Sequence, residues 1–353
     1  MANYHRRRLG TPIIGITGTN GKTTTKELIA TVLKKKYNVL YTQGNFNNHI
    51  GVPKTLLRLR PEHEMAVVEM GANHPGEIDT LVHIAEPDYG IITNVGKAHL
   101  EGFGSFEGVI RTKGELYAFL RNRLNSKVFL HGDNLNLSKI IEDIPVVRYG
   151  SDNAESDYFI QGEVVECAPY LTFQWKQSDS TWHRVETHLI GSYNIDNMLA
   201  AATIGLYFGV TLEEVNDALA SYIPQNNRSQ LDVTAHNHLI IDAYNANPTS
   251  MMAALKNFRE MKVEHKFALL GDMRELGAGS VEEHQKIVNY LKESDFEQVW
   301  LVGPEFGKTN HGYRIFPQVE DVIKALDEEK PENYYVLVKG SNGIHLSKVL
   351  GHL

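Results

Sequence analysis

Short apolar segments alternate with longer segments of helical periodicity over the first 150 residues. The predicted order is strand, helix, strand, strand, helix, strand, helix, strand, helix, at Pro12–Thr17, Thr23–Lys36, Asn38–Thr42, Met65–Met70, Gly76–Ala85, Gly90–Asn94, Phe106–Leu120, Lys127–Leu130 and Leu135–Ile141. Strands that alternate with helices favour a mostly parallel sheet covered on both faces. Ligands of such sheets bind at the carboxyl ends of the strands, so the loops there are the first place to look for chemistry.

The pattern changes at about residues 157–190, which predict a small antiparallel β insert, and two helices follow, near Asn194 and at Leu212–Ser221. The polar segment Pro224–Ser229 predicts a linker. Alternation then resumes, with strands and helices at His238–Ala243, Ser250–Lys256, Lys266–Leu270, Val281–Leu291, Gln298–Val302, Val319–Asp327 and Tyr334–Val338. We therefore expect an α/β fold with two domains. A central P-loop-type domain with the insert covers residues 1–226, and a Rossmann-like domain covers residues 227–353.

Composition narrows the class of protein. The net charge of −8 and the lack of a long basic patch argue against nucleic-acid binding, and we expect Arg6, Arg7 and Arg8 to form a solvated tail. The single cysteine, Cys167, excludes a disulfide framework and a multi-cysteine zinc site. The chain has no stretch of about 18 apolar residues and no apolar core of a signal peptide at its start, so we expect a cytoplasmic protein without a membrane span.

The segment GITGTNGKTTTKE, residues 15–27, predicts a phosphate-binding loop. A standard P-loop has a glycine at the position of Ile16, whereas the glycines here are Gly15, Gly18 and Gly21, so this loop is a variant. Glycines let the backbone approach phosphates, and N–H groups at a helix start point at negative charge. Lys22, expected in an exposed loop, would supply positive charge, and the Thr23 hydroxyl can reach Mg²⁺. The alternative is a glycine turn followed by a surface lysine.

Two further side chains are candidate metal ligands. Glu69 ends a buried strand, where a carboxylate is costly unless it is paired or metal-bound. His99 follows the next strand, in TNVGKAHLEGFGS. The alternatives are a salt-bridged glutamate and a structural histidine.

Nine stretches occur in an order that resembles the Mur ligases: TGTNGKTTTKE, TQGNFNNHIGVPKTLL, VVEMGANHPGEI, TNVGKAHLEGFGS, KGELY, GSYNIDNMLAA, DAYNANPTSM, LLGDMRELG and LVKGS. GANHPGEI and DAYNANPTSM resemble the MurF type in particular. The resemblance runs from about residue 12 to the carboxyl terminus. It implies an ATP- and Mg²⁺-dependent ligase that adds D-alanyl-D-alanine to UDP-N-acetylmuramoyl-tripeptide through an acyl phosphate, for peptidoglycan synthesis. Separately from the resemblance, we expect a monomer.

The resemblance also assigns roles to individual residues. The nucleotide and its metal would be held by Gly18, Thr19, Asn20, Gly21, Lys22, Thr23, Thr24, Glu69, His99, Asn194, Asn197, Arg228 and Asp242. Lys113 falls where many members carry a carbamoylated lysine, which could help to hold a second Mg²⁺; its alternative is an ordinary surface lysine paired with Glu115 or a neighbour. The substrates would meet Asn45, Asn47, Asn48, Asn245, Lys339 and Ser341. Lys22, His99, Lys113 and Arg228 are the expected catalytic residues.

Two alternatives to this function stay open: another ligase of the same superfamily, such as a folylpolyglutamate synthase or a MurE-type enzyme, and a P-loop NTPase switch. Family members also carry an amino-terminal domain for the uridine diphosphate group, and the first strand here starts at about Pro12. We therefore expect the chain as printed to bind nucleotide, and to ligate little unless that domain is supplied.

Overall fold

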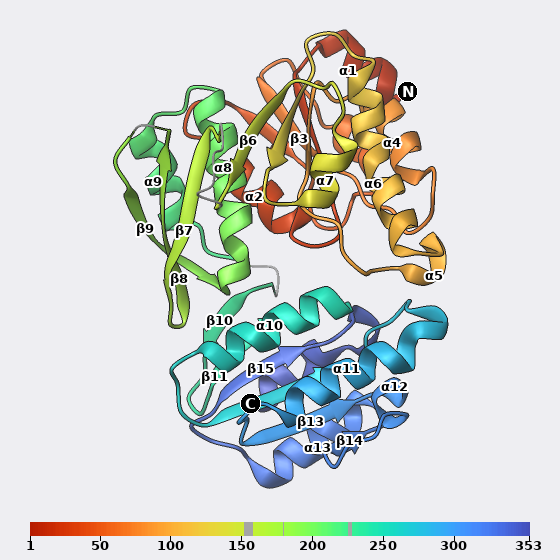
Figure 1. Ribbon diagram of the computed structural model, residues 1–353, viewed down its shortest axis with the longest axis vertical. Helices are drawn as coiled ribbons and strands as arrows, with labels where there is room; N and C mark the ends of the chain where they lie inside the picture. Colours follow the sequence, from red (N-terminus) through yellow and green to blue (C-terminus); the bar gives the residue numbers. More distant parts are fainter. Residues whose placement is uncertain (152–157, 179, 225–227) are drawn as a thin grey trace.

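Two sheets organise the chain, each covered by helices on both faces (Figure 1). The computed structural model describes residues 1–151, 158–178, 180–224 and 228–353. Part of the predicted linker and the predicted boundary between residues 226 and 227 lie outside these residues, as does residue 157 at the start of the predicted insert.

The first sheet has nine strands in the order β2-β3-β1-β4-β5-β6-β7-β8-β9. In chain order they are β1 (Ile13–Thr17), β2 (Val39–Tyr41), β3 (Met65–Glu69), β4 (Tyr89–Ile92), β5 (Lys127–His131), β6 (Val146–Gly150), β7 (Ile160–Cys167), β8 (Tyr170–Gln177) and β9 (His183–Ile190). All pairs up to β6–β7 are parallel. The interior strand β1 lies between β3 and β4, so the loop after it opens where the chain passes to either side of the sheet.

Helices cover this sheet on both faces. On one face lie α2 (Lys22–Leu33), α8 (Ile195–Tyr207) and α9 (Leu212–Ser221), with the short η1 (Ser192–Asn194) before α8. On the other lie α1 (Ala2–Leu9), α3 (Gly51–Leu56), α4 (Glu77–Ala85), α5 (Leu100–Phe103), α6 (Phe106–Arg121) and α7 (Leu135–Ile140). Strands such as β1 are buried throughout, as expected for a parallel sheet between two helical layers.

The predicted antiparallel strands are present, but they continue the first sheet and do not form a separate one. β7 pairs parallel with β6, and β8 and β9 then pair antiparallel at the edge. The reason is their buried face: Leu171, Phe173 and Trp175 are fully buried and join the core beneath α8 and α9. The Trp175 Nε1 group also donates to Asn216 Oδ1 of α9 at 2.9 Å.

The second sheet has six strands in the order β10-β11-β15-β12-β13-β14, parallel except for β10. They are β10 (Gln230–Val233), β11 (His238–Asp242), β12 (Lys266–Gly271), β13 (Gln298–Val302), β14 (Arg314–Phe316) and β15 (Tyr335–Lys339). The helices are α10 (Pro248–Glu260), η2 (Gly277–Gly279), α11 (Ser280–Lys292), α12 (Pro304–Gly307), α13 (Val319–Glu329), η3 (Asn342–Ile344) and η4 (Leu346–His352). α10 lies on the side of this sheet that faces the first domain (Figure 1).

The prediction of a solvated tail at the amino-terminal arginines was wrong for Arg6, although Arg7 and Arg8 are exposed. These residues form α1, and Arg6 is only 5% exposed. Its guanidinium donates to the carbonyl oxygens of Ala85 and Glu86, at 2.8 and 2.6 Å, and to the Asp88 carboxylate at 3.0 Å. The first two acceptors are at the carboxyl end of α4, where helix carbonyls lack partners and favour a cation.

Among the helices of the described residues, none has the length and apolar character needed to cross a membrane.

Candidate active site

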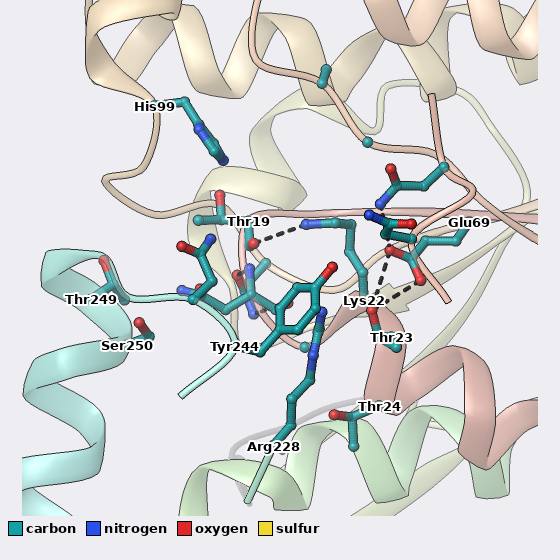
Figure 2. Close-up of a pocket in the computed structure, with 18 of the residues that line it drawn as sticks. Thr19, Lys22, Thr23, Thr24, Glu69, His99, Arg228, Tyr244, Thr249 and Ser250 are labelled. Carbon is teal, nitrogen blue, oxygen red and sulfur yellow. Dashed lines mark hydrogen bonds between the residues drawn. The ribbon is translucent and has the colours of Figure 1, made fainter. Parts of the chain in front are cut away.

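A cavity of about 730 Å³ lies between the two domains and is lined by residues of both. Most of the predicted site residues line it: Thr19, Asn20, Gly21, Lys22, Thr23, Thr24, Asn45, Asn47, Asn48, Glu69, His99, Asn194, Asn197, Arg228, Asp242, Asn245 and Lys339. Figure 2 shows Lys22 and Thr23 opposite Tyr244, Thr249 and Ser250 of the second domain, with His99 and Arg228 reaching in from other sides. The carboxyl ends of β1, β3 and β4 thus meet the second domain at one place.

The phosphate loop has the backbone that its glycines predict. Gly18 has φ +146° and Gly21 has φ +79°, both in the range that favours glycine. A Cβ atom on Gly18 would lie 2.0 Å from Thr93 Oγ1, and one on Gly21 would lie 2.6 Å from Asn197 Oδ1. Gly21 is also the residue before α2, so the free N–H groups of that helix start open toward the cavity.

Lys22 was expected in an exposed loop, and this prediction was wrong. It is the first residue of α2 and is half-buried. Its Nζ atom donates to the carbonyl oxygens of Gly18 and Thr19, at 2.8 and 3.0 Å (Figure 2). Burial lowers the pKa of Lys22 to about 8; the Glu69 carboxylate opposes this shift and the Arg228 charge adds to it. Its ammonium is therefore poorly solvated and, within the part of the chain that the structure describes, has no acidic hydrogen-bond partner, so an arriving anion would stabilise it.

Glu69 and Thr23 form a pair of oxygen donors. Glu69 is 1% exposed at the end of β3 and accepts from the Thr23 hydroxyl, 3.1 Å from Oε2, and from Asn47 Nδ2 at 2.9 Å. Buried Lys26 balances its charge, with Nζ 3.6 Å from Oε2, and this Nζ has no hydrogen-bond partner among the described residues. No group of three or more His, Cys, Asp or Glu side chains in those residues is arranged to hold a metal. A hydroxyl and one carboxylate suit Mg²⁺ only when phosphates and water complete its shell.

His99 lines the cavity, and Lys113 lies just behind the cavity wall. His99 Nδ1 pairs with the Glu275 carboxylate of the second domain. Burial lowers the pKa of His99, and the charges of Lys22 and Lys113 act in the same direction, against Glu275.

Lys113 is 2% exposed and lies just behind the cavity wall, where its Nζ donates to the carbonyl oxygen of Ala72 at 3.2 Å. Burial lowers its pKa to about 7, with the charge of Lys22 adding to the shift. Glu115 accepts from the backbone N–H groups of Gly76 and Asp79, each at 2.8 Å, and so caps α4. The alternative of a surface lysine paired with Glu115 is therefore excluded.

The two asparagines at the start of α8 join that helix to the phosphate loop helix. Asn197 Nδ2 donates to Asn194 Oδ1, and Thr25 of α2 donates to Asn197 Oδ1, both at 2.8 Å. Asn194 Nδ2 donates to the carbonyl oxygen of Ile190 at 2.8 Å and to Ser229 Oγ at 3.1 Å. The pair thus holds the start of α2, the start of α8 and the first described residues of the second domain together.

The second domain contributes charge of both signs. The Arg228 guanidinium lies 3.8 Å from the centre of the Tyr244 ring, and its buried Nε has no hydrogen-bond partner among the described residues. Asp242 at the end of β11 pairs with Lys339 at the end of β15, and Lys339 is 1% exposed. A guanidinium that stacks on a ring keeps its donor edges available to an anion.

The family models separate the chain at the same place as the two sheets. Residues 16–205 match the Mur ligase middle domain, and residues 227–342 match the Mur ligase glutamate ligase domain. The chain belongs to the Mur ligase family.

Individual Mur ligases are similar over almost the whole chain. The UDP-N-acetylmuramoyl-tripeptide–D-alanyl-D-alanine ligase of Escherichia coli (strain K12) is 37% identical over 360 residues, which cover 99% of this chain and 78% of the relative. The crystal structure I of MurF from Acinetobacter baumannii matches with a TM-score of 0.88 at 29% identity, over 99% of this chain and 78% of that one. MurF from Thermotoga maritima in complex with ADP matches with a TM-score of 0.87 at 26% identity, over 99% and 82%.

In this Mur ligase, three predicted site residues do not line the cavity: Gly18, Lys113 and Ser341. Ser341 is 3% exposed; its Oγ accepts from the Arg274 N–H at 2.9 Å and donates to the Ala246 carbonyl at 3.3 Å. Its hydroxyl is thus used to hold the loops after β11 and β12. Asn48 similarly uses Oδ1 to accept from the N–H groups of Ile50 and Gly51, at 3.0 and 2.9 Å, so part of the asparagine-rich loop holds itself.

Several cavity residues of this Mur ligase were not predicted as site residues: Asn73, Glu77, Asn94, Tyr193, Asp196, Thr249 and Ser250. Asn94 accepts through Oδ1 from the Asn20 N–H at 2.9 Å and thereby fixes the phosphate loop. In the stretch TNVGKAHL, only His99 was predicted as a site residue. A polar residue at the carboxyl end of a predicted parallel strand was the available signal for Asn94.

Proposed function

We propose that this chain is an ATP-dependent amide ligase that joins D-alanyl-D-alanine to the carboxylate of UDP-N-acetylmuramoyl-tripeptide. The main structural support is one cavity in which the phosphate loop, the Thr23–Glu69 pair and Lys22 face Arg228 and Asp242 of the second domain. The relatives that carry the name of this activity support the same substrates. The setting is peptidoglycan precursor synthesis in the cytoplasm.

The proposed reaction solves a leaving-group problem. A carboxylate does not accept an amine at neutral pH, because oxide is a poor leaving group. The γ-phosphoryl group of ATP is therefore transferred to the acceptor carboxylate, ADP leaves, and the amine of D-alanyl-D-alanine attacks the acyl phosphate. The amide forms, inorganic phosphate leaves and the amine gives up a proton. Such chemistry needs charge neutralisation and positioning above all.

Lys22 and Arg228 neutralise the transferred group in this proposal. The Lys22 ammonium donates to two carbonyl oxygens and to no carboxylate of the described residues, so it can turn toward phosphate oxygens without breaking an ion pair. Arg228 approaches from the second domain with an unpartnered Nε, so it reaches the phosphates only when that domain is docked.

Thr23 and Glu69 would hold Mg²⁺, which when bound neutralises phosphate charge. Asn47, which donates to Glu69, keeps that carboxylate oriented, and Lys26 balances its charge from behind. His99 would add to the metal site after leaving Glu275. Carbamoylation of Lys113 would replace an ammonium behind the cavity wall with an anion. The low pKa of that amine supports the modification.

The remaining contacts divide between nucleotide and substrates. Asn194 and Asn197 would lie at the adenine and Asp242 at the ribose, with Lys339 released from Asp242 or shared with it. Lys339 and Asn245 would meet the incoming dipeptide. Asn45, Asn47 and Asn48 would face the muramoyl-peptide.

The test is a coupled ADP-release assay with ATP, Mg²⁺ and UDP-N-acetylmuramoyl-tripeptide. D-alanyl-D-alanine is compared with single amino acids such as L-alanine, L-lysine and glutamate. Even if turnover is slow, as expected above for this chain alone, we expect ADP release to depend on the dipeptide and one amide to form for each ADP. Equal ADP release without any amine would indicate an NTPase switch, and preference for a single amino acid would indicate another ligase of the superfamily.

A further inference from the structure

A reciprocal amide pair joins the phosphate loop to the second domain. Asn247 Nδ2 donates to Asn20 Oδ1 at 2.7 Å, and Asn20 Nδ2 donates to Asn247 Oδ1 at 3.4 Å. The two residues lie 227 positions apart in the chain. Asn247 is 5% exposed and Asn20 is half-buried, so this contact is partly shielded from water.

The first domain fixes the backbone of Asn20 but leaves its side chain alone. The Asn20 N–H donates to Asn94 Oδ1 at 2.9 Å, and its carbonyl accepts from the Thr93 hydroxyl at 2.6 Å. Among the described residues, the side chain of Asn20 has hydrogen bonds only to Asn247. The position of this side chain, next to Gly21 and Lys22, is therefore set by the second domain.

Asn247 has a second role that does not need its amide nitrogen. It precedes α10, where its Oδ1 accepts from the Ser250 N–H at 2.9 Å and Ser250 Oγ accepts from its N–H at 3.1 Å. Serine caps a helix start about as well as asparagine. The donor that points at Asn20 is thus additional to capping.

We propose that Asn247 is a positioning residue of the triphosphate site: when the second domain docks, its amide fixes the Asn20 side chain and orders the phosphate loop. Nucleotide binding and domain docking then favour each other, because each lowers the cost of the other. The proposal rests on one part of the proposed function, namely that the loop binds a nucleoside triphosphate.

Calorimetric titration with Mg²⁺ and a non-hydrolysable ATP analogue tests it. We expect Asn247→Ser to keep the cap and to weaken nucleotide binding roughly fivefold, about what one neutral hydrogen bond contributes. Asn247→Ala also loses the cap, and should weaken binding no further. Binding by Asn247→Ser that equals wild type, or a much larger loss in Asn247→Ala, would overturn the proposal. No binding by the wild-type chain would instead overturn the proposed function.

The matched control is Lys97→Ala. Lys97 Nζ pairs with Glu283 at 3.0 Å across the same domain contact, and Lys97 is not among the hydrogen-bond partners of Asn20 in the described residues. Amide hydrogen exchange of residues 15–25 in the nucleotide-free protein measures the coupling between the Asn20 and Asn247 side chains. We expect faster exchange in Asn247→Ser and in Asn20→Ala, with no further rise in the double variant, whereas Lys97→Ala should add its effect to that of Asn247→Ser. Effects of Asn20→Ala and Asn247→Ser that add fully would show that the two side chains do not act through each other.

Discussion

At the scale of single residues, Lys22 carries the charge that the proposed phosphoryl transfer needs. Among the described residues its hydrogen bonds are to the carbonyl oxygens of Gly18 and Thr19 alone, so Lys22→Ala removes charge and little packing. We expect ADP release to fall by about 10²–10³ or more, as when one donor to a developing charge is removed, while circular dichroism stays unchanged. Lys35→Ala, just past the other end of α2, is the control and should retain activity. Normal turnover in Lys22→Ala would refute the role of the loop.

Lys113 gives a pH dependence with a defined sign. Only the neutral amine reacts with CO₂, and burial lowers the pKa of this amine to about 7, so the reactive form grows as the pH rises through about 7. With dissolved CO₂ held constant, we expect a carbamate signal in ¹³C NMR that increases from pH 6 to 8 and is absent in Lys113→Ala. Lys286, an exposed lysine whose pKa is raised by Glu282 and Glu283, should give no signal in this range. The absence of a carbamate signal from Lys113 at pH 8 would contradict carbamoylation of this residue.

At the scale of elements, two glycines make a matched pair. Gly21 precedes α2 with φ 79° and ψ −9°, and Gly76 precedes α4 with φ 82° and ψ −8°. Alanine at either pays roughly 1–2 kcal/mol for left-handed backbone. At Gly76 the new Cβ meets nothing within 4 Å, whereas at Gly21 it lies 2.6 Å from Asn197 Oδ1.

We therefore expect Gly21→Ala to lower the melting temperature more than Gly76→Ala, since Asn197 must give up its bond to Thr25, a further ~1 kcal/mol. Thermal unfolding followed by circular dichroism measures both. Nucleotide affinity should fall only in Gly21→Ala. Equal shifts in the two variants would mean that Asn197 moves aside freely.

The periodicity of the sequence predicted most elements because burial in a parallel sheet leaves a strong pattern. Gln298–Val302 and Leu212–Ser221 have the predicted bounds, and others differ by a few residues. α3, α5, α12, β6, β10 and β14 were not predicted; each has three to six residues, too few for a periodic pattern. α1 was missed because its three arginines resemble solvent-exposed sequence, and only the distant carboxyl end of α4 explains the burial of Arg6.

The candidate site was predictable where it follows strand ends and family motifs, as for Lys22 and Glu69. It was not predictable where a contact depends on how two domains dock. The Asn20–Asn247 pair and the His99–Glu275 pair each join residues more than 170 positions apart, with no local signal in either segment. Burial of Lys113 is likewise a property of packing between α6 and the loop before α4.

At the scale of the whole molecule, the nucleotide is expected to act as a bridge. The phosphate loop belongs to the first domain and Asp242 to the second, so binding should favour the docked arrangement of Figure 1. We expect small-angle scattering to give a smaller radius of gyration with Mg²⁺ and the ATP analogue than without. Lys22→Ala, which should bind nucleotide poorly, is the control and should show less change. Identical dimensions of the wild-type protein with and without nucleotide would contradict this view.

The central claim is that this cavity activates a carboxylate by phosphoryl transfer, and oxygen labelling tests it most directly. The acceptor peptide is prepared with ¹⁸O in its reacting carboxylate and incubated with ATP, Mg²⁺ and D-alanyl-D-alanine. Transfer through an acyl phosphate predicts one ¹⁸O atom in each inorganic phosphate released, detected by ³¹P NMR or mass spectrometry, together with one amide. Phosphate that forms without ¹⁸O would show that water attacks ATP directly, and would contradict the account.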